Sequence, residues 1–209
     1  MRLKNVKGAT TVVENSVYLI KNPEQYKGKF ESLFFNQNPI RIEIGMGKGN
    51  FIIENAKKYP NINFIGIEKY DSVMIRAVQK LDTLELKNLK LIRMDANRIE
   101  EVFDHEIDLI YLNFSDPWPK ARHEKRRLMS PNFLNKYSLI FKNKNRIELK
   151  TDNRVLFEYA IKTFNEEHFK IDDICLNLYA EDTSNNIPTE YELKFKEQGF
   201  PIYQIKVQK

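Results

Sequence analysis

The sequence alternates short apolar runs with amphipathic segments, and a cluster of glycines opens the alternation. Gly45, Gly47 and Gly49 are three of only seven glycines in 209 residues. Closely spaced glycines mark backbone that turns sharply or approaches another group. The β-rich run 40–44 (IRIEI) precedes the cluster, and a segment with apolar residues at helical spacing follows it. Strand, glycine turn and helix together form the opening of a βαβ unit.

The same pattern repeats and predicts an α/β fold with a mostly parallel sheet. Strands are predicted at 40–44, 63–67, 89–94, 107–114, 146–149, 171–179 and 202–207. Helices are predicted at about 71–81 and 131–142, the second with Ser130 as its N-cap, and a further helix has Asp152 as its cap. Residues 1–35 do not join the alternation, which divides the chain into an N-terminal extension (1–35) and one domain (36–209). The polar stretch 181–188 is predicted to be a loop before the last strand.

Composition excludes several classes of protein. A single cysteine, Cys175, permits neither an intrachain disulfide nor a multi-cysteine zinc site, and it is predicted to be a small buried hydrophobe. No apolar run approaches the roughly 18 residues of a membrane span. The first twenty residues lack the apolar stretch of a signal peptide, so a cytoplasmic location is expected.

Positive charge is concentrated in one place. The chain carries 34 Lys and Arg against 29 Asp and Glu, a formal charge of +5. Most of that excess lies in the segment 120–127 (KARHEKRR), which we call the basic segment. One concentrated patch is typical of a docking site for a polyanion, and the alternative is an ordinary solvated loop.

Acidic and polar residues follow successive predicted strands. In open parallel sheets, ligands bind beyond the carboxyl ends of the strands. These ends carry Glu43, Glu68, Asp95, Asn113 with Ser115 and Asp116, and Thr151 with Asp152. Like charges in one crevice repel each other. A ligand with positive charge and hydroxyl groups would account for their convergence.

The glycine loop alone does not identify that ligand. An acidic residue at Glu68 suits ribose hydroxyls of either a nicotinamide cofactor or S-adenosylmethionine. Glu43 favours S-adenosylmethionine, because a carboxylate beside the glycines repels a pyrophosphate and attracts an ammonium or a sulfonium. The alternative for Glu43 is a structural ion pair with Arg41 or Lys69.

The segment 113–120 (NFSDPWPK) places the only tryptophan, Trp118, between two prolines. Prolines fix backbone torsions, so the loop after the fourth strand is predicted to be stiff. An aromatic ring in a rigid loop beside a carboxylate suits a nucleobase platform. The alternative is a buried aromatic plug with a surface lysine beside it.

Seven motifs together resemble the bacterial tRNA (guanine-N7-)-methyltransferase family. They are EIGMGKG at 43–49, GIE at 66–68, MDA at 94–96, NFSDPWPK at 113–120, HEKRR at 123–127, TDN at 151–153 and TEYE at 189–192. The resemblance implies a Rossmann-like class I methyltransferase fold with helices on both faces and an antiparallel last strand. It implies methyl transfer from S-adenosylmethionine to a guanosine at position 46 in the variable loop of tRNA.

The resemblance also implies the roles of individual residues. Asp116 is the expected catalytic residue. The expected cofactor-binding residues are Glu43, Gly45, Gly47, Glu68, Asp95, Ala96 and Asp116. The expected substrate contacts that the resemblance implies are Lys120, Asp152, Thr189, Tyr191 and Glu192. The charge of the basic segment adds Arg122, His123, Lys125, Arg126 and Arg127 as expected substrate-binding residues, with the four cations on phosphates. No metal and no membrane partner is expected, and the chain is expected to be a monomer or a homodimer.

Two other hypotheses stay open from the sequence. The first is a nicotinamide oxidoreductase, which Glu43 and the absence of a third fingerprint glycine at Asn50 disfavour. The second is a catalytically silent RNA-binding subunit on a methyltransferase fold, which the intact row of carboxylates disfavours. The chemistry of guanine N7 agrees with the leading hypothesis, because N7 has a free lone pair and needs no general base. His105, His123 and His168 are scattered, and none is assigned to catalysis.

Overall fold

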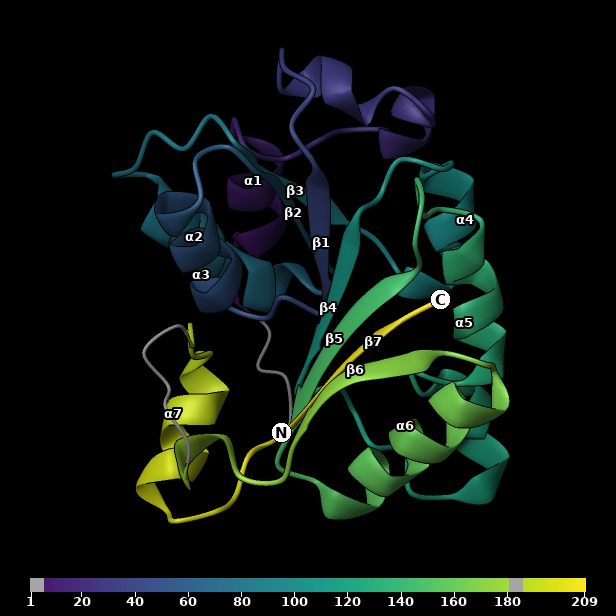
Figure 1. Ribbon diagram of the computed structural model, residues 1–209. Helices are drawn as coiled ribbons and strands as arrows, with labels where there is room; N and C mark the ends of the chain where they lie inside the picture. The colour runs from purple at the N-terminus through teal and green to yellow at the C-terminus, as the bar shows by residue number, and fades with distance from the viewer. Residues whose placement is uncertain (1–5, 181–185) are drawn as a thin grey trace.

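The computed structural model describes residues 6–180 and 186–209, and its centre is one seven-stranded sheet (Figure 1). The strands in chain order are β1 (Ile40–Ile44), β2 (Asn63–Glu68), β3 (Leu89–Arg93), β4 (Leu109–Asn113), β5 (Arg146–Thr151), β6 (Lys170–Cys175) and β7 (Tyr203–Gln208). Their order across the sheet is β3-β2-β1-β4-β5-β7-β6. The predicted α/β fold is confirmed.

The sheet has the predicted strand directions. Neighbouring strands from β3 to β5 pair in parallel. β7 lies between β5 and β6 and is antiparallel to both, as predicted for the last strand. The chain builds outward from β1 in one direction and then restarts on the other side with β4. That reversal is the point where open α/β sheets bind their ligands.

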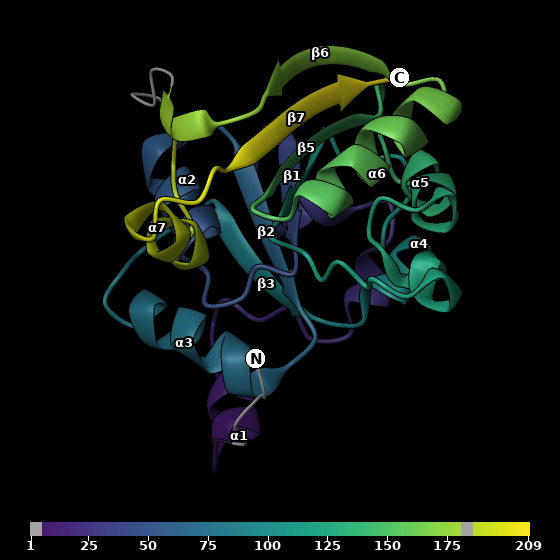
Figure 2. The same cartoon turned by 90° about the horizontal axis from the view of Figure 1, so that it is seen from below.

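Helices cover both faces of the sheet, and one helix lies beyond its carboxyl edge (Figures 1 and 2). The α-helices are α1 (Ala9–Glu14), α2 (Asn50–Lys58), α3 (Asp71–Leu81), α4 (Ile99–Val102), α5 (Pro131–Ser138), α6 (Arg154–Glu166) and α7 (Glu190–Glu197). Short 3-10 helices span Pro23–Tyr26, Phe30–Leu33, Ala96–Arg98, Ala121–Arg126 and Leu178–Ala180. α2 and α3 pack on one face, with α1 outside α3, and α4, α5 and α6 pack on the other.

Burial explains why the central strands are the most apolar. Every residue of β2 and of β4 is buried, as expected for strands covered on both faces. β6 lies at the edge of the sheet, and only Cys175 of its six residues is buried. The prediction that Cys175 is a small buried side chain is confirmed. Among the described residues, no helix is long and apolar enough to cross a membrane.

The described part of the N-terminal extension packs against the domain. The backbone of Ile20 donates to the carbonyl of Leu91 at 2.9 Å, and Leu91 donates to Tyr18 at 2.8 Å. These bonds occupy the free edge of β3. Phe30 is fully buried in the main core. Residues 6–35 therefore contribute to the stability of the sheet they cover.

Several predicted boundaries are wrong, each for a local reason. The sixth strand ends at Cys175 and not at 179, because the chain turns into the 3-10 helix Leu178–Ala180. The helix from Pro131 ends at Ser138, four residues early, and Ser130 occupies its N-cap position without a side-chain hydrogen bond to the helix backbone. Asn153, not Asp152, caps α6 by accepting the backbone N–H of Leu156.

The stretch 181–188 was predicted to be a loop. Residues 181–185 lie outside the described residues, and residues 186–188 are irregular. The prediction placed no helix between this stretch and the last strand, whereas α7 follows it directly.

Candidate functional site

The glycine loop after β1 leaves open space at the carboxyl edge. Gly45, Gly47 and Gly49 all have positive φ, at 77°, 59° and 78°, which favours glycine. A Cβ on Gly49 would lie 2.6 Å from the Cβ of Ala77, so any other residue would push α2 and α3 apart. A Cβ on Gly45 or Gly47 would meet nothing within 4 Å. A ligand can therefore approach the backbone of this loop closely.

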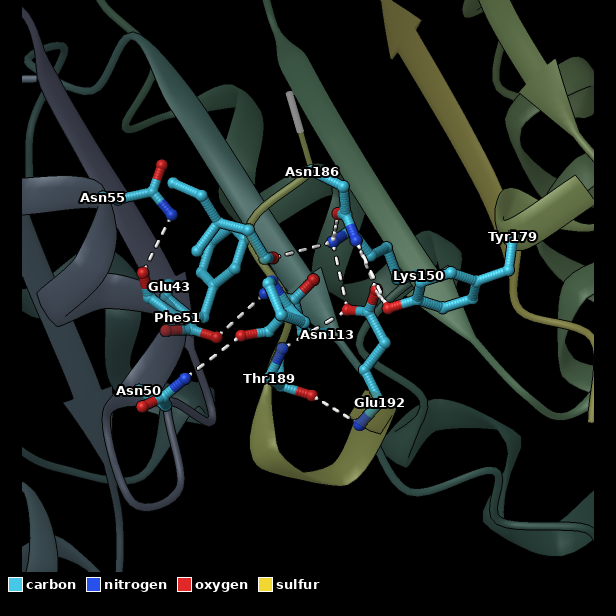
Figure 3. A network of polar contacts seen from close by, with 12 residues as sticks. Glu43, Asn50, Phe51, Asn55, Asn113, Lys150, Tyr179, Asn186, Thr189 and Glu192 are labelled. Atoms are coloured by element: carbon cyan, nitrogen blue, oxygen red, sulfur yellow. Dashed lines mark hydrogen bonds and ion pairs between the residues drawn. The ribbon is translucent and has the colours of Figure 1, made fainter. Parts of the chain in front are cut away.

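Glu43 ends in the interior beside that loop, with half of its carboxylate unpaired. The residue is only 1% exposed. Nδ2 of Asn113 on β4 donates to its Oε1 at 2.8 Å (Figure 3). Its Oε2 is buried and has no partner among the described residues. Buried polar atoms nearly always have a partner, so this oxygen marks a place where a cationic ligand group would fit.

Burial raises the pKa of Glu43 to about 8, although the Asn113 hydrogen bond and the charge of Lys150 oppose the shift. The structural alternative for Glu43 is wrong. Arg41 instead donates to the hydroxyl of Tyr111 at 3.0 Å, and the Lys69 ammonium lies 2.7 Å from a carboxylate oxygen of Asp95.

Glu68 connects the end of β2 to the glycine loop. Its carboxylate accepts the backbone N–H groups of Gly47 at 3.1 Å, Lys69 at 2.8 Å and Tyr70 at 3.1 Å. Burial raises its pKa, while these three hydrogen bonds oppose the shift. A carboxylate has about four acceptor positions, so one stays available for a hydroxyl group.

Asp95 stands at the end of β3, the next strand end along the edge. It caps the 3-10 helix that begins at Ala96, accepting the backbone N–H of Asn97 at 2.9 Å. Burial alone would raise its pKa, but the hydrogen bonds from Lys69 and Asn97 outweigh burial and lower it. Asp95 is therefore a charged acceptor at the edge, held in place by its own turn.

The loop after β4 carries Asp116 and is held in an unusual backbone conformation. Phe114 and Trp118 both have positive φ, at 50° and 41°. Positive φ is uncommon for bulky residues, and residues that adopt it are often found at functional sites. Asp116 is exposed and accepts no hydrogen bond from a described residue. Its charge acts on both Glu68 and Tyr191. Asp116 thus lies near both Glu68 at the end of β2 and Tyr191 in the first turn of α7.

The basic segment folds as the 3-10 helix Ala121–Arg126 beside this loop. Four of its cations are exposed: Lys120, Arg122, Lys125 and Arg126. Arg127 is different, because it donates to the carbonyl oxygens of Pro117 and Trp118, both at 3.1 Å, and lies 4.2 Å from the Tyr159 ring. Arg127 therefore stabilises the loop after β4, because its guanidinium binds two carbonyl oxygens of that loop.

Trp118 is only partly buried. The Arg126 guanidinium lies 4.9 Å from the centre of its ring, and the His123 ring meets it edge-on at 5.6 Å. Trp118 is therefore not a fully buried plug. Its use as a nucleobase platform stays a prediction.

The residues of the segment 189–192 (TEYE) lie in two different environments. Thr189 and Glu192 form a capping box at the start of α7. Tyr191 between them is 49% exposed. Burial and the charges of Asp152 and Asp116 raise its pKa. Asp152, after β5, is half-buried, and burial raises its pKa also. Tyr191 and Asp152 therefore face the same edge as Asp116.

A buried network holds Glu192 inward (Figure 3). Lys150 on β5 forms an ion pair with its Oε2 at 3.1 Å, and the two side chains are 6% and 0% exposed. Tyr179 and Asn186 donate to its Oε1 at 2.8 and 2.7 Å. Lys150 also donates to the backbone carbonyl of Ile187 at 3.1 Å. Glu192 thus fixes α7 to the sheet, and Thr189 caps the helix. Contact of these two residues with substrate stays a prediction.

Sequence reasoning missed Lys150 and its partner Asn186, and also Tyr179, which donates to Glu192. β5 (RIELKT) alternates charged and apolar residues, so in the sequence Lys150 resembles a solvent-facing side chain and its burial leaves no signal. The partners of Lys150, Asn186 and Glu192, lie 36 and 42 residues further along the chain. No spacing in the sequence reveals such contacts. Among the described residues, no cluster of three or more His, Cys, Asp or Glu could hold a metal ion.

The sheet order, the glycine loop after β1 and the carboxylates at successive strand ends define a class I methyltransferase fold. Solved structures share this fold. An antibiotic-related methyltransferase matches 87% of this chain and 92% of its own, with a TM-score of 0.64 and 17% identity. The 16S rRNA methyltransferase KamB covers the same shares with a TM-score of 0.67. A SAM-dependent methyltransferase from Aquifex aeolicus covers 98% of both chains with a TM-score of 0.58.

Sequence comparison narrows the class to one family. Residues 37–205 match a family model described as "Putative methyltransferase". The tRNA (guanine-N(7)-)-methyltransferases of Bacillus licheniformis and Bacillus subtilis are each 48% identical over 94% of this chain and 93% of theirs. That of Listeria innocua is 48% identical over 99% and 97%. The chain belongs to the tRNA (guanine-N7-)-methyltransferase family.

Proposed function

We propose that this protein transfers the methyl group of S-adenosylmethionine to N7 of a guanosine in tRNA, at position 46 of the variable loop. The observation that carries the proposal is the 48% identity, over nearly the full length of both chains, to tRNA (guanine-N(7)-)-methyltransferases. The chemistry of the carboxyl edge supports it independently, because the unpaired oxygen of Glu43 suits a cationic ligand.

The residues at the carboxyl edge of the sheet would each bind a different part of S-adenosylmethionine. Glu43 would accept its ammonium group, and Glu68 has an acceptor position for ribose hydroxyls. Gly45 and Gly47 would let it approach the backbone of the glycine loop. The remaining cofactor contacts proposed are Asp95, Ala96 and Asp116. The cofactor supplies an electrophilic methyl group on a sulfonium, which suits attack by an unprotonated ring nitrogen.

The protein's own task in this reaction is to position the base and stabilise charge. Guanine N7 has an in-plane lone pair and no proton to lose, so no residue must act as a general base. The main demand is alignment of N7 with the methyl group and exclusion of water. Asp116 would accept hydrogen bonds from the N–H edge of guanine, and these strengthen as positive charge develops on the purine. Its exposed, unpaired carboxylate leaves it free for that contact.

The proposed tRNA contacts fall into two groups. The four exposed cations of the basic segment would bind backbone phosphates, with His123 beside them, while Arg127 braces the loop that carries them. Asp152 and Tyr191 would address the target nucleotide itself. Thr189 and Glu192 would act by fixing Tyr191 at the start of α7.

Nucleoside analysis tests the proposal. Unmodified tRNA is incubated with the protein and S-adenosylmethionine, digested, and its nucleosides are separated by mass and retention time. We expect 7-methylguanosine and no other methylated nucleoside. Absence of any methylated product, with tRNA still bound, would favour a silent RNA-binding subunit. Binding of NAD in place of S-adenosylmethionine would favour an oxidoreductase.

A further inference from the structure

A row of four aromatic rings leads from the Asp116 loop to the far end of α7. Phe114 and Tyr191 have ring centres 5.3 Å apart, and Tyr191 stacks on Phe195 at 4.5 Å with an interplanar angle of 28°. Phe195 in turn lies 5.7 Å from Phe200. We call these four residues the aromatic row. It begins two residues before Asp116 and ends at Phe200, beyond the last residue of α7.

The outer members of the aromatic row are exposed. Tyr191 is 49% exposed and Phe200 is 52% exposed, whereas Phe114 and Phe195 are partly buried beneath them. Large aromatic side chains are rarely left this open on a well-packed helix, and adjoining ones mark an interaction surface. Lys194 and Lys196 are exposed on the same helix. Glu197 is exposed there too, and the Lys196 ammonium lies 4.3 Å from the centre of the Tyr179 ring. The surface therefore combines flat apolar rings with charges of both signs, of which Lys194 is the cation available to a phosphate.

The aromatic row is ordered before any partner binds. Thr189 caps α7, and Lys150 anchors Glu192 in the interior, which fixes the helix that presents Tyr191. At the other end, Gly199 has a φ of 74° and turns the chain so that the backbone of Phe200 donates to the carbonyl of Phe195 at 3.1 Å. A preformed surface binds with a smaller loss of conformational entropy.

We propose that the aromatic row is a stacking surface for the unpaired nucleotides that border the target guanosine. The proposal rests on the proposed function, because that function supplies the RNA. Unpaired bases stack on exposed aromatic side chains, and neighbouring cations bind their phosphates. Of the two exposed rings, Tyr191 lies nearer the site, since the charges of Asp116 and Asp152 both act on it. Phe200 lies furthest from Asp116 along the row and is assigned to a flanking nucleotide.

The experiment compares Phe200→Ala with Phe35→Ala. Phe35 is 96% exposed and precedes the start of β1, at the opposite edge of the sheet, which makes it a matched control. Affinity for tRNA is measured by filter binding, and affinity for S-adenosylmethionine by calorimetry. We expect Phe200→Ala to weaken tRNA binding roughly 5- to 150-fold, the range that corresponds to about 1–3 kcal/mol of stacking. Phe35→Ala should stay within twofold of the wild type, and cofactor affinity should be unchanged in both variants.

Two further variants separate stacking from folding and from general apolar contact. Phe200→Tyr should retain wild-type affinity, because it keeps the flat ring. Phe200→Leu keeps apolar bulk against Phe195 but has no ring face, so it should bind as weakly as Phe200→Ala. Thermal unfolding midpoints of all variants report whether α7 is intact. Equal affinity of Phe200→Leu and wild type, or of Phe200→Ala and Phe35→Ala, would overturn the proposal.

A second probe distinguishes failure of this proposal from failure of the proposed function. The same variants are titrated with a short unpaired oligoribonucleotide and with one of equal length that carries abasic sites. Loss of binding by Phe200→Ala should occur only with the intact bases. If Phe200→Ala binds the intact oligoribonucleotide more weakly but the wild type forms no 7-methylguanosine, the stacking surface stands and the proposed methylation is rejected. Methylation with no such loss would keep the function and reject the surface.

Discussion

Protonation of Glu43 makes cofactor binding depend on pH in a defined direction. Burial raises the pKa of Glu43 to about 8, so in the free protein at pH 7 about nine carboxyls in ten carry a proton. Binding of a cationic ammonium requires the charged form. We therefore expect S-adenosylmethionine binding at pH 7 to release close to one proton. Affinity should rise about tenfold between pH 6 and pH 7, which is about 1.4 kcal/mol, and less steeply from pH 7 toward pH 8.

The ligand limits this rise on the alkaline side. An α-amino group loses its own proton near pH 8, so affinity should pass through a maximum there. Glu43→Gln is the matched control. In this variant the affinity for S-adenosylmethionine should no longer rise from pH 6 to pH 8, but it should still fall above pH 8. Calorimetry in two buffers of different ionisation enthalpy measures the released protons directly. A wild-type protein that releases no proton at pH 7, or a Glu43→Gln variant with the same ascending limb, would refute this reasoning.

The same shift affects stability in the free protein. Between the ordinary pKa of 4.5 and about 8, the folded protein holds the Glu43 proton that the unfolded chain releases. The contribution of Glu43 to the free energy of unfolding therefore falls as the pH rises through this window. The full shift has an upper bound of about 5 kcal/mol. Urea unfolding at pH 6 and pH 9 should show a steeper loss in the wild type than in Glu43→Gln.

Three further predictions concern the reaction, the RNA and the buried network. Asp116→Asn should keep the fold and lower the single-turnover rate of methylation at saturating substrates, because it loses roughly 2–4 kcal/mol of transition-state stabilisation. A rate within a few-fold of the wild type would show that Asp116 is only a turn residue. Changing the four exposed cations of the basic segment to alanine should make the slope of log tRNA affinity against log salt shallower by about 3–4 units, and an unchanged slope would place the phosphates elsewhere. Lys150→Met should destabilise the protein by about 3–5 kcal/mol, because Glu192 is left buried and charged. Glu192→Gln should recover part of that loss in urea melts, and strict additivity of the two changes would show that the pair does not interact.

Hydrophobic patterning was sufficient to predict the sheet and the row of acidic residues at its carboxyl edge. Fully buried strands such as β2 and β4 leave a strong signal, because both of their faces must be apolar. Glu43, Glu68, Asp95 and Asp116 could be predicted to converge, since the carboxyl ends of parallel strands meet at one edge. Their convergence depends only on topology, which the alternation of strands and helices reveals.

Contacts between distant segments could not be predicted. α7 was missed because it is short and mostly polar, with only Glu192 buried among its eight residues. Its position depends on Lys150, whose role becomes visible only once β5 is placed against the segment 186–192. Arg127 was grouped with the other cations of the basic segment, although it is occupied by two carbonyl oxygens of its own loop. The charge of an arginine in the sequence does not show whether its side chain binds a phosphate or stabilises its own loop.

Mapping of the modified nucleotide tests the central claim most directly. An unmodified tRNA transcript is treated with the protein and S-adenosylmethionine, then reduced and exposed to aniline, which cleaves the strand at 7-methylguanosine. The account predicts a single cleavage at position 46, and none when that guanosine is replaced by adenosine or when Asp116→Asn is used over the same short time. Cleavage at other guanosines with position 46 intact, or no cleavage at all, would contradict it.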